Sequence, residues 1–292
     1  MKTSGTFTLH RFTIPLRKIG SPVKLIFFGD VHRDSPTHAL SHWKEFLRYA
    51  KQNVANSYFI GMGDYLDATS TSERIGLRSI KHLLHDTERA AREERSRKCV
   101  EDFANEIGFM KGRLVGLLNG NHYHEFEDGT NSDQYLCRLL GCKYLGVSSF
   151  VRLSFDNHGS SLTLDGWLHH GAGGARLPGG SVNRVAQMSE IAEADFFASG
   201  HDHRRGVWPC NPRLSLEADH RTPSGLRLRE RQGWLIKSGS FLAAYEDNVA
   251  SYNVDAGRGP CSLGHAELEV RMTRHRAKPD VDVRALEVRG IA

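Results

Sequence analysis

The sequence predicts an α/β fold with a layered core of two mixed sheets. Short apolar runs that end in glycine recur along the chain, and such runs are typical of strands buried on both faces. Segments with helical periodicity lie between them, and strands that alternate with helices indicate a layered α/β fold. An alternating segment at 150–155 and a strand-rich C-terminal part predict antiparallel strands as well. We therefore expect mixed sheets rather than a single parallel one.

Five apolar runs are the predicted buried strands. They are "VKLIFFGD" from Val23, "SYFIGMGD" from Ser57, "RLVGLLNGNH" from Arg113, "SLTLDGWLHHG" from Ser161 and "ADFFASGHDH" from Ala194. The alternation of "FVRLSF" from Phe150 predicts an antiparallel strand before the fourth run. "GWLIKSGSF" and "HAELEVRMTR" predict two more strands near the C-terminus.

Two segments carry the spacing of an amphipathic helix. The first has one apolar face made of Leu40, Trp43, Leu47 and Ala50. The second is a long, charged segment from about Thr87, with Val100, Phe103, Ala104 and Ile107 on one face. Residues 69–112 are long for a connection, so we expect a helical insertion there. The prediction is one domain over 1–276 with residues 277–292 as a C-terminal tail.

Composition excludes several classes of protein. The 292 residues are 39% hydrophobic and 25% charged, which allows a normal globular core and argues against global disorder. Five scattered cysteines, none in CxxC spacing, argue against a disulfide framework or a structural zinc cluster. With no signal-peptide pattern and no run of 18 apolar residues, we expect a cytoplasmic protein with no membrane partner. The net charge of +5 and the pI near 9.0 are compatible with a polyanionic partner.

Polar side chains follow each of the five predicted buried strands. In chain order they are Asp30 and His32, Asp64, Asn121 and His122, His169 and His170, and His201 and His203. Ligands of α/β sheets sit beyond the carboxyl ends of the strands, so these side chains are expected to converge. Imidazole, carboxylate and amide oxygen together suit divalent metals such as Mn²⁺, Fe²⁺ or Zn²⁺.

The number of candidate ligands indicates two metal ions. Without His122 and with only one of His169 and His170, seven side chains remain, which are too many for one ion. Two ions accommodate them if one carboxylate bridges, and Asp64 is the natural candidate. A pair of ions about 3.5–4 Å apart stabilises both the attacking and the leaving oxygens in phosphoryl displacement.

The ordered set "GDVH", "GD", "GNH", "HHG" and "GHDH" resembles the calcineurin-like metallophosphoesterase superfamily over roughly residues 23–240. The resemblance implies a four-layered α-β-β-α sandwich with a dinuclear metal centre at the strand ends. It implies that a metal-bound hydroxide attacks phosphorus and that His122 protonates the leaving group. We expect manganese first, with iron, zinc or nickel as alternatives.

The resemblance also implies a role for each ligand. Asp64 bridges the two ions, and the remaining ligands divide between them: Asp30, His32 and His203 on the first ion, and Asn121, His170 and His201 on the second. His170 is preferred to His169 because the family ligand often directly precedes glycine, although either side chain could face inward.

This chain departs from the family pattern after "GNH". Tyr123 stands where an acidic residue often orients the catalytic imidazole. That carboxylate is missing, displaced to Glu125 or Asp34, or replaced. "GDYLDAT" and "GNHY" also lack the arginine and the glutamate that the Ser/Thr protein phosphatases carry, so that class is disfavoured.

The substrate is less well determined by the sequence than the metal centre. "GAGGARLPGG" from Gly171 lacks the Lys-Ser/Thr of a P-loop and is expected to be a flexible loop. Arg176 within it, and Arg204 and Arg205 after "GHDH", are candidates to contact a substrate phosphate. A looser resemblance of the C-terminal part to phage- and prophage-type members, together with the basic pI, favours a phosphodiesterase or nuclease. The alternatives are a small-molecule or nucleotide phosphomonoesterase and an inactive scaffold on the same fold; the oligomeric state is open.

Overall fold

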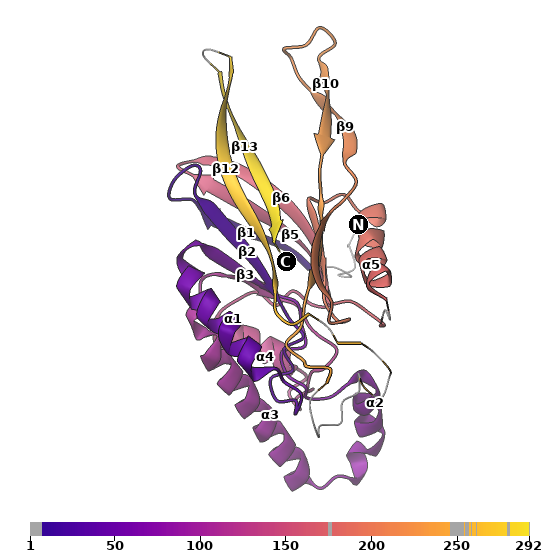
Figure 1. Cartoon of the computed structure of the whole chain (residues 1–292). Coiled ribbons are helices and arrows are strands. Elements are labelled where there is room, and N and C mark those ends of the chain that lie inside the picture. Colours follow the sequence, from indigo (N-terminus) through magenta and orange to yellow (C-terminus); the bar gives the residue numbers. More distant parts are fainter. Residues whose placement is uncertain are drawn as a thin grey trace.

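The computed structural model of the chain describes residues 8–174, 177–245, 254, 257, 259–260, 262–278 and 281–291. Two large sheets pack face to face (Figure 1). The five-stranded sheet has the order β13-β12-β2-β3-β4, with parallel pairing of β2, β3 and β4. Its strands are β13 (Val281–Ile291), β12 (Ala266–Lys278), β2 (Pro22–Phe28), β3 (Ser57–Gly61) and β4 (Leu114–Leu117).

The six-stranded sheet has the order β1-β5-β6-β7-β11-β8 and mixes parallel and antiparallel pairs. Its strands are β1 (Thr8–Pro15), β5 (Ser148–Asn157), β6 (Ser160–His169), β7 (Phe196–Ser199), β11 (Trp234–Ser238) and β8 (Arg205–Pro209). The antiparallel pairing of β5 with β6 confirms the strand predicted from the alternation at 150–155.

Helices cover the outer face of each sheet, so that the molecule has the four expected layers. The helices against the five-stranded sheet are α1 (Leu40–Asn53), α3 (Asp86–Glu106) and α4 (Ser132–Leu140). Helix α5 (Pro178–Ile191) packs on the six-stranded sheet through Val185 and Met188. The central apolar layer lies between the sheets, with Phe27 and Phe196 in edge-to-face contact at 5.8 Å. The predicted α-β-β-α sandwich is confirmed.

Helices occupy most of residues 69–112, and the two main helices differ in burial. Helix α3 buries Val100, Phe103 and Ala104, as its spacing predicts. Helix α2 (Thr71–Ile80) is mostly exposed, but it buries Arg74. Short 3-10 turns follow at Lys81–Leu83 and Gly108–Met110, and another, Val54–Asn56, follows α1.

The apolar face of helix α1 is rotated slightly from the face that the spacing predicts. Trp43, Phe46 and Ala50 are buried, whereas Leu40 at the first turn is 43% exposed. Phe46 is buried because its ring packs beside Phe28 of the adjacent strand, with ring centroids 5.6 Å apart.

The C-terminal segment differs from the predicted tail. Residues 281–291 form β13, which pairs antiparallel with β12 from Ile291 opposite Glu267 to Val281 opposite Lys278. Apolar residues at 281, 283, 286 and 288 give this segment strand character that a tail would not have. The expected loop at 171–180 also ends early, because Pro178 occupies the first turn of α5, a position that favours proline.

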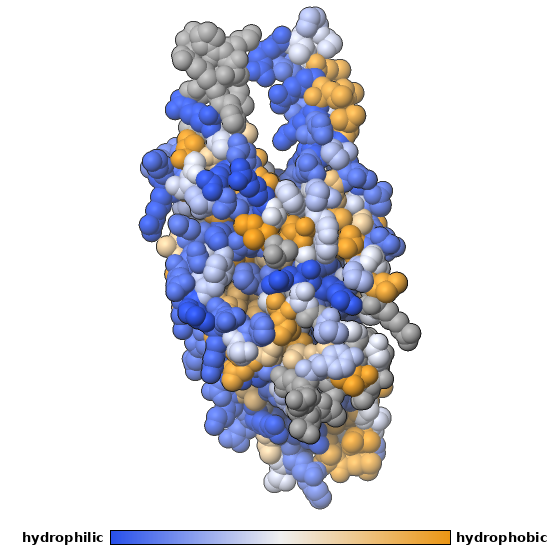
Figure 2. Space-filling model, viewed as in Figure 1, coloured by the Kyte–Doolittle hydropathy of each residue, from blue (hydrophilic) through white to orange (hydrophobic). Residues whose placement is uncertain are grey.

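Two hairpins project beyond the sandwich at the same end of the molecule (Figure 1). One is β12–β13, and the other is the separate two-stranded sheet of β9 (Arg213–Ala218) and β10 (Leu226–Arg231). The β9–β10 hairpin presents apolar surface to solvent (Figure 2). Its exposed apolar side chains are Leu214, Leu216, Leu226 and Leu228.

Candidate metal centre

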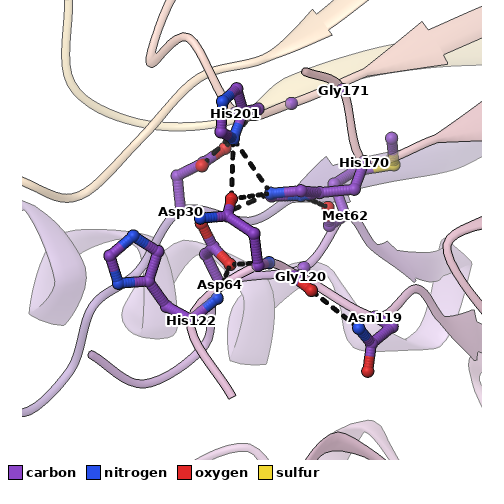
Figure 3. Close-up of polar contacts among 12 residues, drawn as sticks. Asp30, Met62, Asp64, Asn119, Gly120, His122, His170, Gly171 and His201 are labelled. Carbon is purple, nitrogen blue, oxygen red and sulfur yellow. Dashed lines mark hydrogen bonds and ion pairs between the residues drawn. The ribbon is translucent and has the colours of Figure 1, made fainter. Parts of the chain in front are cut away.

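The predicted ligands come from the ends of strands in both sheets. Asp30 and His32 follow β2, and Asp64 follows β3. Asn121 follows β4 in the same sheet. From the other sheet come His170 after β6, and His201 and His203 after β7. Figure 3 shows Asp30 and Asp64 from one sheet close to His170 and His201 from the other.

The backbone is left-handed at five of these ligands. The φ angles are 46° at Asp30, 44° at His32, 50° at Asp64, 72° at His201 and 60° at His203. Within the described ranges, His158 in a hairpin turn is the one other non-glycine residue with a positive φ. Such conformations cost of order 1–3 kcal/mol each and cluster at functional sites. The chain therefore maintains strained turns at the positions where it presents these side chains.

The first cluster consists of Asp30, His32 and His203, each of which offers a ligand atom within 4.8 Å of the others. His203 Nε2 lies 3.6 Å from Asp30 Oδ1. The imidazole rings of His32 and His203 are 5.4 Å apart between centroids. Asp30 also accepts the backbone N–H of His201, with 2.9 Å between N and Oδ2. This bond joins the turn after β7 to the turn after β2.

The second cluster consists of Asp64, His170 and His201, with the amide of Asn121 between the imidazoles. Asn121 Oδ1 lies 2.9 Å from His170 Nε2 and 2.7 Å from His201 Nδ1. The two imidazole nitrogens are 3.3 Å apart. Met62 O lies 2.7 Å from His170 Nδ1, which leaves Nε2 directed into the cluster (Figure 3).

His170 and His169 are placed differently. His170 is 2% exposed and belongs to the second cluster. His169, the last residue of β6, is half-buried and accepts the backbone N–H of Gly171 at Nδ1, 2.7 Å away. The preference for His170 as the ligand therefore agrees with the geometry, although the ligand role itself stays a prediction.

Asp64 lies between the two clusters. Its Oδ2 is 3.8 Å from His32 Nε2 and 3.3 Å from His170 Nε2. Its Oδ1 accepts the backbone N–H groups of Asn121 and His122, at 2.7 and 2.9 Å. Burial acts to raise the pKa of Asp64, but the charges of His170, His32 and His122 outweigh it and hold that pKa well below its usual range. One carboxylate thus faces histidines of both clusters, as a bridging ligand must.

The donor set fits divalent cations. Within the described residues, Nε2 of His32 is buried and has no hydrogen-bond partner. Burial raises the pKa of Asp30 to about 6, and the charge of Asp64 adds to this effect. Burial and the charge of His170 lower the pKa of His201 to about 4, which keeps that imidazole neutral, as a metal ligand must be. Two buried carboxylates beside several imidazoles form a site that a cation would stabilise.

Asp67 is a functional candidate that the sequence reasoning missed. Its Oδ1 lies 2.7 Å from Nδ1 of His122 and 3.3 Å from Nδ1 of His32. These contacts lower the pKa of Asp67, chiefly through His122. The carboxylate beside His122 therefore comes from the loop after β3. The only sequence signal was the second aspartate of "GDYLDAT".

The two acidic residues suggested for this role lie elsewhere. Glu125 pairs with Arg78, with Nε 3.0 Å from Oε2. Asp34 accepts the backbone N–H of Asp67 at Oδ1, 2.6 Å away. Asp34 therefore holds the Asp67 loop rather than His122.

A buried ion pair supports the turn that carries His201 and His203. Lys237 Nζ lies 2.9 Å from Asp202 Oδ1 and donates to Gly200 O at 2.8 Å. Asp202 Oδ2 also accepts the hydroxyl of Ser181 on α5, at 2.7 Å. Burial lowers the pKa of Lys237, and the charge of Asp202 opposes this effect. Nothing in "WLIKSGS" marked this lysine as part of the site.

Two of the arginines considered as substrate contacts, Arg204 and Arg205, lie in the described residues. Arg176 lies outside the described residues. Arg204 is half-buried after His203, and its backbone N–H lies 3.4 Å from Asp202 Oδ1. Arg205 donates from Nη1 to Leu263 O at 2.9 Å. Substrate contact by Arg204 stays a prediction.

No helix among the described residues is long and apolar enough to cross a membrane. Neither a family model nor a curated protein matches the chain.

Solved structures do match it. A conserved uncharacterized protein from Streptococcus pneumoniae, described as a predicted phosphoesterase, is 11% identical, with 91% of this chain and 99% of that chain covered and a TM-score of 0.34. Vps29 from Chaetomium thermophilum is 10% identical, with 92% and 96% covered and a TM-score of 0.35. In its motif order, its four layers and the convergence of its predicted ligands, the chain resembles the calcineurin-like metallophosphoesterases.

Proposed function

We propose that this protein is a metal-dependent phosphoester hydrolase with a dinuclear centre. The observation that carries the proposal is the convergence of seven side chains of the predicted types into two clusters with Asp64 between them. The first ion would be held by Asp30, His32 and His203, and the second by Asn121, His170 and His201. Manganese is the proposed metal, with iron, zinc or nickel as alternatives.

When bound, such a pair of cations supplies both the activation of the nucleophile and the stabilisation of charge on the phosphoryl oxygens. The role of the chain is to orient the ligands and to deliver a proton. His122 is the proposed general acid, since it follows a ligand and is not itself assigned as one. With Nδ1 directed to Asp67, the proton that His122 transfers to the leaving oxygen is on Nε2.

We propose a phosphodiester as the substrate, with nucleic acid as the leading candidate. A monoester dianion is bound strongly by arginine side chains held in fixed positions. In "GDYLDAT" this chain has Ala68 where the Ser/Thr protein phosphatases carry an arginine. A diester on a longer polyanion is attracted by the general field of a basic protein, and the pI of this chain is near 9.0. Phosphomonoesterase activity is the alternative. A cytoplasmic location is proposed from the free cysteines 99, 137, 142 and 210.

The test is a substrate panel on the Mn²⁺-loaded protein, with Asp30→Asn as the inactive reference. The panel compares p-nitrophenyl phosphate, bis-p-nitrophenyl phosphate, cyclic nucleotides, and single- and double-stranded DNA and RNA. We expect a higher kcat/KM for bis-p-nitrophenyl phosphate than for the monoester. Nucleic-acid cleavage should fall steeply as salt rises from about 50 to 200 mM. A preference for the monoester without cleavage of DNA or RNA would favour the alternative, and no hydrolysis at all would favour the inactive scaffold.

A further inference from the structure

Helix α2 of the insertion buries an arginine beside the metal-centre loop. Arg74 is 7% exposed. Its Nη1 donates to the carbonyl oxygens of Thr69, Asn121 and Tyr123, at 2.7 Å for Asn121 and 3.3 Å for Tyr123. Its Nη2 donates to Thr71 Oγ1 at 3.1 Å. Among the described residues, these hydrogen-bond acceptors are carbonyls and a hydroxyl rather than carboxylates.

The same guanidinium lies over an aromatic ring of that loop. Its central carbon is 3.8 Å from the centroid of the Tyr123 ring, within the range of a cation–π contact. Tyr123 is the residue that departs from the acidic residue often found after "GNH". In this chain its ring supports Arg74, and its carbonyl also accepts the hydroxyl of Thr69 at 2.6 Å.

The loop 121–123 is therefore held from two directions. Asp64 Oδ1 accepts the N–H groups of Asn121 and His122. Arg74 donates to the carbonyls of Asn121 and Tyr123. Between these two attachments lie the amide that faces His170 and His201 and the imidazole beside Asp67.

Burying a cation whose hydrogen-bond acceptors are neutral has a high desolvation free energy. A neutral side chain would pack α2 against the rest of the domain with a smaller desolvation penalty. The planar guanidinium, however, satisfies several carbonyls in fixed directions and stacks on an aromatic face at the same time, which an ammonium group cannot do. The contacts of Arg74 are thus better explained by a role in fixing the loop 121–123 than by a role in stabilising helix α2.

We propose that Arg74 is a positioning residue for the Asn121–His122 pair, and that the helical insertion delivers it to the metal centre. This inference rests on the proposed function for its catalytic consequence. Independently of that function, the inference states that Arg74 holds the backbone of residues 121–123 in its conformation.

The test compares Arg74→Met and Arg74→Lys with Arg78→Met as the matched control. Arg78 lies one turn along the same helix, is exposed and bonds Glu125. The first readout is amide hydrogen exchange of the metal-free protein. We expect faster exchange over 119–124 in Arg74→Met, a smaller increase in Arg74→Lys, and no change there in Arg78→Met. Unchanged protection over 119–124 in Arg74→Met would overturn the proposal.

The second readout is Mn²⁺ affinity, measured by calorimetry on folded protein, together with kcat and KM. Loss of an outer partner of a metal ligand weakens metal binding or activity by about 10- to 100-fold. We expect a loss of that size in Arg74→Met, with kcat falling and KM nearly constant, and partial rescue in Arg74→Lys. A lower melting temperature of Arg74→Met with unchanged Mn²⁺ affinity and unchanged kcat would show that Arg74 only attaches helix α2, and would refute the positioning role. If wild-type protein binds none of Mn²⁺, Fe²⁺, Zn²⁺ and Ni²⁺, the proposed function fails, while hydrogen exchange still decides whether Arg74 holds the loop.

Discussion

Replacing Asp67 with asparagine tests the assignment of His122 most sharply. The carboxylate lies 2.7 Å from Nδ1 of His122 and 3.3 Å from Nδ1 of His32. The amide of the variant would keep the size of the side chain but would lose the negative charge that faces Nδ1 of His122. We expect Asp67→Asn to lower kcat while the protein stays folded, because Asp67 is partly exposed in a surface loop.

The magnitude follows from the single contact to His122. A hydrogen bond to a charged group contributes about 1.5–3 kcal/mol. Since about 1.36 kcal/mol corresponds to a tenfold change in rate, the expected loss in kcat is about 10- to 150-fold. Asp67→Asn should add little to the loss already caused by His122→Ala, because both changes remove the same proton transfer. A smaller effect through His32 should appear as weaker Mn²⁺ binding.

The assay is steady-state hydrolysis of aryl methyl phosphates that differ only in the pKa of the leaving phenol. General acid catalysis matters most for poor leaving groups, so the loss should be largest for phenol and smallest for p-nitrophenol. Glu125→Gln is the control, since that carboxylate bonds Arg78 and should leave the rates unchanged. Equal losses across the series, or additive losses in the double variant, would refute the reasoning.

Two further predictions concern the packing around Asp64. A Cβ at Gly120 would lie 2.0 Å from Asp64 Oδ1, so Gly120→Ala should destabilise the protein by about 1–3 kcal/mol and abolish Mn²⁺ binding. Gly76→Ala is the control and should do neither, because a Cβ at Gly76 would have no atom within 4 Å. Chemical denaturation and Mn²⁺ titration measure the two effects, and tight Mn²⁺ binding by Gly120→Ala would contradict the predicted clash with Asp64. Burial raises the pKa of Asp133 to about 7, so its protonated form favours the folded state and that contribution is lost as pH rises from about 4 to 7. The unfolding free energy of metal-free wild type minus that of Asp133→Asn should therefore fall over this range, by up to about 1.4 kcal/mol per pH unit in urea titrations, and a constant difference would contradict the raised pKa.

The sequence was most informative where chemistry follows a buried strand. The apolar runs before Asp30, Asp64 and Asn121 are local signals, and parallel strands bring their carboxyl ends to one edge without further information. The choice between His169 and His170 needed the point at which β6 ends, which the sequence determines less well.

Residues that act through tertiary contacts could not be identified in this way. Arg74 bonds the carbonyl of a residue 47 positions away, and Lys237 reaches back 37 positions to Gly200. No local pattern tells which surface-type side chain will be buried against such a partner. Strand β13 was missed for a different reason: its apolar residues at 281, 283, 286 and 288 do not alternate strictly, and the pairing with β12 that completes the strand is a tertiary contact.

The central claim is a two-ion centre bridged by Asp64, and the most direct measurement is the metal content of protein saturated with Mn²⁺ and then desalted. We predict close to two equivalents per chain for wild type and for His169→Ala. Asp64→Asn should reduce this to one equivalent or less, because both ions lose a shared ligand. At most one tight equivalent in the wild type, left unchanged by Asp64→Asn, would contradict the claim.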